Sequence, residues 1–131
     1  MDKASVEEFH DKCYVFDGHA DTMSNVMRSG KSFLKRNNKW HVDLPRMLKG
    51  SIDAEIIAVF TPSKCRGAEA ALYAMKMISL IHKTVRDSDG KIRIALRSSD
   101  FKKNPGTVSF VIGLESGSPL AGDIKLLEAF Y

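Results

Sequence analysis

The sequence predicts an α/β fold built on a parallel sheet. Three short runs of apolar and β-branched residues predict buried strands over 13–16, 54–60 and 107–114. A long amphipathic helical pattern at 69–86 separates the second strand from the third, and shorter helical stretches follow the first and the third. Because strands that alternate with helices form right-handed βαβ units, the three strands are expected to run in the same direction.

The first part of the chain has helical composition over 4–12 and then the strand at 13–16, which opens into the polar loop Asp17-Gly18-His19-Ala20-Asp21. A short helix is expected at 22–28, ended by Gly30. The stretch from Lys31 to Trp40 is expected to be exposed, with Phe33 and Trp40 as anchors. Its four basic residues also fit an RNA or anionic-surface patch, although a solvated loop is the favoured interpretation.

The next elements have clear boundary signals. Pro45 suits the first turn of a helix, and Asp43 is placed to cap it. The strand at 54–60 stops at Thr61-Pro62. In the following helix, apolar residues recur every three or four positions, at Leu72, Met75, Ile78, Ile81 and Val85. A short helix is expected near 98–103, and the last helical pattern starts at Asp123 and is still apolar where the sequence ends.

The composition indicates one domain in a reducing compartment. The chain has 131 residues, of which 44% are hydrophobic, enough to bury a core. A net charge of +4, with both signs spread along the chain, gives little reason to expect a nucleic-acid partner. Cys13 and Cys65 form no CxxC pair or disulfide framework. The first twelve residues contain no signal peptide or membrane span. A cytoplasmic protein without a membrane partner is expected.

Three side chains are candidates for metal binding. His19 and Asp21 are two positions apart, so in extended chain they face the same side and can converge on one ion. For an isolated HxD triplet, however, a histidine hydrogen-bonded to a turn aspartate is the favoured explanation. Glu115 follows a buried strand, where its two carboxylate oxygens could bridge two cations or cap a helix. Parallel sheets gather functional groups at the carboxyl ends of their strands, which favours the metal interpretation.

Three segments resemble the membrane dipeptidase (renal dipeptidase) family of zinc peptidases, which are amidohydrolase-like barrels. The segments are Asp17-Gly18-His19-Ala20-Asp21, the stretch from His41-Val42-Asp43-Leu44-Pro45-Arg46 to Thr61-Pro62, and Ser109 to Gly117. Their order and spacing also match, over nearly the whole chain. The resemblance implies the amino-terminal portion of a (β/α)8 TIM barrel, with about three βα units and the barrel left incomplete after the third, as a single domain over 1–131.

The resemblance also implies a two-zinc site that hydrolyses dipeptides. It assigns one zinc to His19 and Asp21, and it assigns the bridging position between both zincs to Glu115. The family completes the site with two histidines and an aspartate on later strands, which are not in this sequence. No catalytic residue beyond the metal ligands is therefore expected, and the 131-residue chain is expected to be inactive alone.

Two departures from the family and two alternative functions remain open. Glu55 stands where the family usually has glutamine and would alter the local charge if it faced the site, and Ser116 stands where a second glycine is common. One alternative is a non-catalytic α/β remnant or interaction module, and the other is a metal-dependent amidohydrolase acting on a non-peptide amide. Because three parallel strands leave unpaired edges, the chain is also expected to self-associate.

Overall fold

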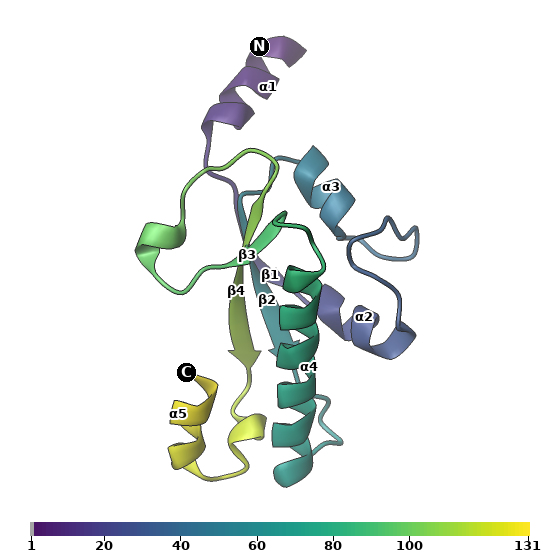
Figure 1. The fold of residues 1–131 in the computed structure, drawn as a ribbon, viewed down its shortest axis with the longest axis vertical. Helices are drawn as coiled ribbons and strands as arrows, with labels where there is room; N and C mark the ends of the chain where they lie inside the picture. Colours follow the sequence, from purple (N-terminus) through teal and green to yellow (C-terminus); the bar gives the residue numbers. More distant parts are fainter. Residues whose placement is uncertain (1) are drawn as a thin grey trace.

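The computed structural model describes residues 2–131, and within them four strands form one parallel sheet (Figure 1). The order across the sheet is β1, β2, β4, β3. The longest ladder joins β2 to β4 and runs from Ala54 opposite Ser109 to Phe60 opposite Glu115. The bounds are Phe16–Ala20 for β1, Ala54–Phe60 for β2, Ile92–Ile94 for β3 and Val108–Glu115 for β4. The predicted parallel α/β fold is confirmed.

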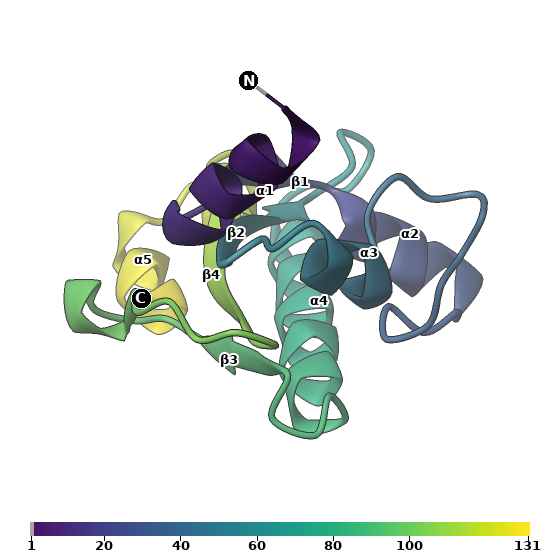
Figure 2. The same cartoon turned by 90° about the horizontal axis from the view of Figure 1, so that it is seen from above.

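One face of the sheet is covered by α2 (Thr22–Ser29), α3 (Leu44–Lys49) and α4 (Ala68–Arg86), as Figure 2 shows. The core lies between these helices and the strands. Ile57 and Phe110 are completely buried there, and the Phe110 ring meets the Phe33 ring edge-on at 5.7 Å between centroids. Apolar burial on this face holds the helices to the sheet.

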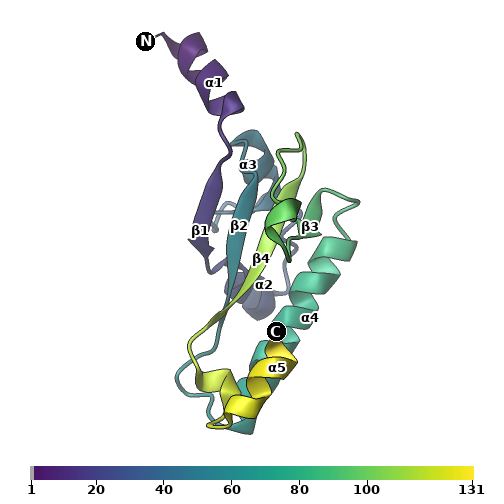
Figure 3. The same ribbon diagram turned by 90° about the vertical axis from the view of Figure 1, so that its left-hand side faces the viewer.

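None of these helices covers the opposite, open face (Figure 3), although the Phe16 ring at its edge packs against Phe101 with 5.9 Å between ring centroids. Successive side chains of a strand point to opposite faces, so Phe16 and Phe60 lie on the side away from the helices and remain 45% and 39% exposed. Over residues 2–131 the sheet does not curl into a closed barrel, and β1 and β3 are its two edges. The prediction of an incomplete barrel portion is confirmed.

Two strand predictions need correction. The first strand lies at Phe16–Ala20 and not at 13–16. The reason is that Asp53 forms hydrogen bonds with both backbone groups of Val15, before the pairing between strands begins. The Asp53 carboxylate accepts from the Val15 N–H, and the Asp53 N–H donates to the Val15 carbonyl. The HxD triplet therefore begins inside the strand. The strand β3, whose three residues pair with the first residues of β4, was not predicted.

The helices agree well with expectation. The amino-terminal helix α1 (Lys3–Lys12) buries no residue and projects away from the sheet in Figure 1. Gly30 ends α2 in the left-handed conformation, and the Asp43 carboxylate accepts from the Arg46 N–H to cap α3. The expected helix at 98–103 is only the 3-10 turn η1 (Ser98–Asp100). The remaining elements are the 3-10 turns η2 (Ser118–Leu120) and η3 (Ile124–Leu126) and the helix α5 (Leu127–Phe130).

Within the described part of the chain, no helix combines the length and the apolarity needed to cross a bilayer. Across the same residues, Cys13 and Cys65 are both free cysteines. The cytoplasmic location stays a prediction.

Candidate metal centre

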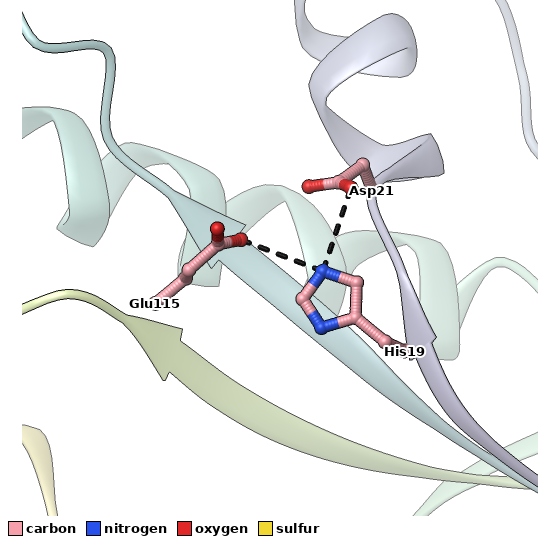
Figure 4. A group of neighbouring side chains, drawn as sticks. All are labelled: His19, Asp21 and Glu115. Carbon is pink, nitrogen blue, oxygen red and sulfur yellow. Dashed lines mark ion pairs between the residues drawn. The ribbon is translucent and has the colours of Figure 1, made fainter.

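The structure brings the three predicted ligands together at the carboxyl edge of the sheet (Figure 4). His19 lies near the end of β1, Asp21 directly follows that strand, and Glu115 is the last residue of β4. The imidazole Nε2 of His19 lies 3.4 Å from Asp21 Oδ2 and 3.5 Å from Glu115 Oε2. One donor atom from each residue falls within 4.8 Å of the others. The predicted convergence of these side chains is therefore observed.

A local irregularity in β1 orients His19. The register against β2 shifts between Asp17 and Ala20, as at a β-bulge, and a bulge redirects the side chains around it. Asp17 Oδ1 accepts a hydrogen bond from the His19 N–H at 3.1 Å, which fixes the backbone of the irregular segment. From the sequence, Asp17 was named only as the first residue of Asp17-Gly18-His19-Ala20-Asp21, without a role of its own. Its position two residues before His19 could have indicated that it orients the histidine backbone.

Asp21 occupies the N-cap position of α2, yet its side chain makes no capping hydrogen bond. The backbone carbonyl of Asp21 accepts from the Ser24 N–H instead, and the carboxylate faces His19. The Asp21 side chain is thus not used for capping and points at the imidazole.

Glu115 faces a hollow of about 280 Å³ on the open side of the sheet. Its side chain is 40% exposed, but Oε2 itself is shielded from solvent and has no hydrogen-bond partner among residues 2–131. The hollow exists because its floor is made of small residues, Ala58 and Gly113. A Cβ at Gly113 would lie 2.8 Å from Ile56 Cγ2, so glycine is needed at this position. A glycine inside a strand was the sequence signal for it.

The donor set suits a small divalent metal ion. Zinc binds imidazole nitrogen and carboxylate oxygen at about 2.0–2.2 Å, which in a tetrahedral site separates neighbouring donor atoms by about 3.3–3.6 Å. The two distances from His19 Nε2, 3.4 and 3.5 Å, fall in this range and exceed an ordinary hydrogen bond. The buried oxygen of Glu115, which lacks a hydrogen-bond partner among the described residues, is a ready ligand atom.

The remaining histidines lie elsewhere. His10 is in α1, His82 is in α4, and His41 is in the loop before α3. Among residues 2–131, the His19, Asp21 and Glu115 group is the only set of three potential ligands within reach of one ion.

Glu55 does not face the candidate metal ligands. Its neighbours in the ladders are Asp17 and Phe110, so its side chain points to the helix-covered face, opposite to the face of Glu115. The side chain is 1% exposed, and neither oxygen has a hydrogen-bond partner within the described range. Burial, and secondarily the charge of Asp17, raise the pKa of Glu55 to about 8. Near neutral pH this carboxyl group is therefore largely protonated.

The fold is similar to that of solved metallopeptidase structures. The crystal structure of dipeptidase AC, a metallopeptidase of family M19, matches with a TM-score of 0.82 and 24% identity over 89% of this chain and 39% of that one. A metallopeptidase from Rhodobacter sphaeroides, bound to a phosphinate mimic of the dipeptide L-Ala-D-Ala, matches with a TM-score of 0.82 and 22% identity over 89% of this chain and 42% of that one.

A third structure, the probable dipeptidase PvdM from Pseudomonas aeruginosa, matches with a TM-score of 0.77 and 17% identity over 97% of this chain and 34% of that one. The chain thus spans less than half the length of these structures. A search of curated proteins found no match. The sequence model of the membrane dipeptidase family, peptidase family M19, matches residues 3–131, and the chain therefore belongs to this family.

Proposed function

We propose that this chain supplies the first half of a two-zinc dipeptidase site. The observation that carries the proposal is the approach of His19 Nε2 to carboxylate oxygens of both Asp21 and Glu115 at one edge of the sheet. Family membership supports a metal-dependent peptidase, and the spacing of the donor atoms supports a tetrahedral ion such as zinc.

The three residues have separate tasks in this proposal. His19 and Asp21 would hold one zinc, and Glu115 would be shared between that ion and a second one. When bound, zinc supplies a Lewis acid that polarises a carbonyl group and lowers the pKa of a coordinated water. The chain's own contribution is to hold the ligands in place: Asp17 fixes the His19 backbone, and Ala58 and Gly113 keep space open beside Glu115.

Dipeptides are the proposed substrates. The related metallopeptidase from Rhodobacter sphaeroides was crystallised with a dipeptide mimic, which supports a short peptide as the substrate class. The second zinc would need ligands beyond those described in residues 2–131, so hydrolysis is proposed for the completed barrel and not for these residues alone.

A completed barrel, reconstituted with zinc, tests this function. We expect it to cleave members of a dipeptide panel, and we expect Glu115→Gln to lower kcat/KM by at least a hundredfold because the amide is a poor bridging ligand. Glu69→Gln on the exposed surface of α4 is the matched control and should retain activity. An intact dipeptide panel would overturn the proposal.

The second candidate is hydrolysis of a non-peptide amide by the same metal site. An amidohydrolase from Pseudomonas aeruginosa shares the fold, with a TM-score of 0.65 and 20% identity over 95% of this chain and 32% of that one. Adding N-acyl amino acids and cyclic amides to the panel separates the two candidates. Faster turnover of these compounds than of dipeptides would favour the second.

A further inference from the structure

The positive charge of this protein is concentrated in one segment. Residues 22–42 contain five Lys and Arg side chains and no Asp or Glu, while the whole chain has a net charge of +4. The rest of the molecule therefore carries a net charge of −1. Four of these cations lie in the loop that joins α2 to α3, at Lys31, Lys35, Arg36 and Lys39.

The loop that carries these cations is held in a fixed shape. Phe33 and Trp40 are buried in the core at its two ends. Between them the Asn37 N–H donates to Asp43 Oδ2 at 2.9 Å, and the Asn37 carbonyl accepts from the Arg46 guanidinium at 3.1 Å. Asp43 is completely buried and also pairs with Arg46. The anchored backbone presents the lysine and arginine side chains from defined positions.

The loop borders an open surface hollow of about 520 Å³ whose charged lining is entirely cationic. The four cationic side chains line it together with Ser32, Asn37 and Asn38. All four are exposed, and among the ion pairs within residues 2–131 none involves any of them. Their mutual repulsion is relieved only by solvent, salt or a bound anion.

We propose that this hollow binds a compact oligophosphate, meaning a ligand with two or more neighbouring phosphate groups. One phosphate group carries only about −1.5 to −2 charges at neutral pH, so the four cations around this hollow are balanced better by two or more neighbouring phosphates. Arg36 also offers the planar donor set that pairs with phosphate oxygens in bidentate fashion. Single-stranded RNA fits less well, because bases stack on exposed aromatic rings, and Phe33 and Trp40 are only 1% and 7% exposed.

The site is separate from the metal centre. The loop lies on the side of the helices, as Figure 1 shows, whereas the metal ligands lie at the carboxyl edge of the sheet next to its open face. The proposal does not depend on dipeptide hydrolysis.

Calorimetric titration of the metal-free chain with inorganic tripolyphosphate at about 0.15 M salt tests the site. Lys35→Gln combined with Arg36→Gln removes two cations from the hollow, and we expect the Kd to rise at least tenfold. The control, Lys64→Gln combined with Lys91→Gln, removes the same charge from exposed positions elsewhere and should change the Kd less than twofold. Thermal melting followed by circular dichroism is the check that both double variants are folded.

Vesicles that carry phosphatidylinositol bisphosphate identify the source of the phosphate groups. Retention on these vesicles, reversed by tripolyphosphate and lost in the Lys35 and Arg36 variant, would assign the hollow to a lipid headgroup, and absence of retention would assign it to a free ligand. No binding of tripolyphosphate, an equal loss in both double variants, or single-stranded RNA that binds more tightly and is not displaced by tripolyphosphate would overturn the proposal.

Discussion

His19 Nε2 and Glu115 Oε2 lie 3.5 Å apart although they come from β1 and β4, which are separated by β2. Strands two positions apart in a sheet are roughly 10 Å from each other, so both side chains must reach across β2. They can do so because Ala58, the residue of β2 beneath them, and its register partner Gly113 are small. The space above these two residues is thus part of the candidate metal centre.

Gly113→Ala is expected to close this space and to destabilise the fold. The new Cβ would lie 2.8 Å from Ile56 Cγ2, so the sheet or the isoleucine must shift. Overpacking of this kind typically costs about 1–3 kcal/mol. Urea denaturation measures the change, and Ile56→Ala in the same chain should recover part of the loss by removing the clashing methyl group.

Gly117→Ala is the control for this prediction. A Cβ at Gly117 meets no atom within 4 Å among the described residues, and its φ of −84° is ordinary. The free energy of unfolding of the Gly117→Ala variant should stay within about 0.5 kcal/mol of that of the parent chain. Equal destabilisation by both substitutions would contradict the packing explanation.

Glu55 is expected to make the protein less stable as the pH rises. The pKa of this carboxyl group goes from an ordinary 4.5 to about 8 in the folded chain. Between these values the folded state holds a proton that the unfolded chain has lost, so the free energy of unfolding falls across this window. At pH 7 the free energy of unfolding is expected to be about 3 kcal/mol lower than it is below pH 4.5.

Glu55→Gln removes the ionisable group and should flatten this pH dependence, stabilising the protein at pH 7 and above relative to the parent. Urea denaturation at several pH values from 4.5 to 8.5 measures the slope, with Glu69→Gln on the surface of α4 as the matched control. A parent and a Glu55→Gln variant with the same slope would show that Glu55 is not the group responsible.

Self-association of the polypeptide 1–131 is expected from its open face and its two strand edges, β1 and β3. Light scattering coupled to size-exclusion chromatography measures the mass. Phe16→Ser on the open face should raise the monomer fraction, whereas Leu72→Ser, at a slightly more exposed apolar site on α4, should not. A parent chain that elutes as a clean monomer would refute the expectation.

Much of the fold could be predicted from the sequence because local signals coincide with element boundaries. Ala54–Phe60 was predicted with its observed bounds, since a dense β-branched run stops at a proline. The first strand was placed three residues too early, because the side chain and backbone of Asp53 determine where pairing begins, and this long-range contact leaves no local pattern. The strand β3 was missed because three residues are too short for a periodicity.

The site was predictable in its composition but not in its geometry. The pair His19 and Asp21 followed from a two-residue spacing, and Glu115 followed from its position after a strand. The geometry depends on how the strands pair, which no local pattern reveals. This applies to the irregularity in β1, to the hydrogen bond from the His19 N–H to Asp17, and to the free space beside Gly113. The same dependence decided which face Glu55 occupies.

Calorimetric titration of the chain with zinc tests the metal centre most directly. We expect one zinc bound per chain and a Kd that rises at least a hundredfold in His19→Ala, while His82→Ala, which removes an exposed imidazole from α4, leaves the Kd unchanged. Binding that is equally weak in the parent, His19→Ala and His82→Ala would contradict it.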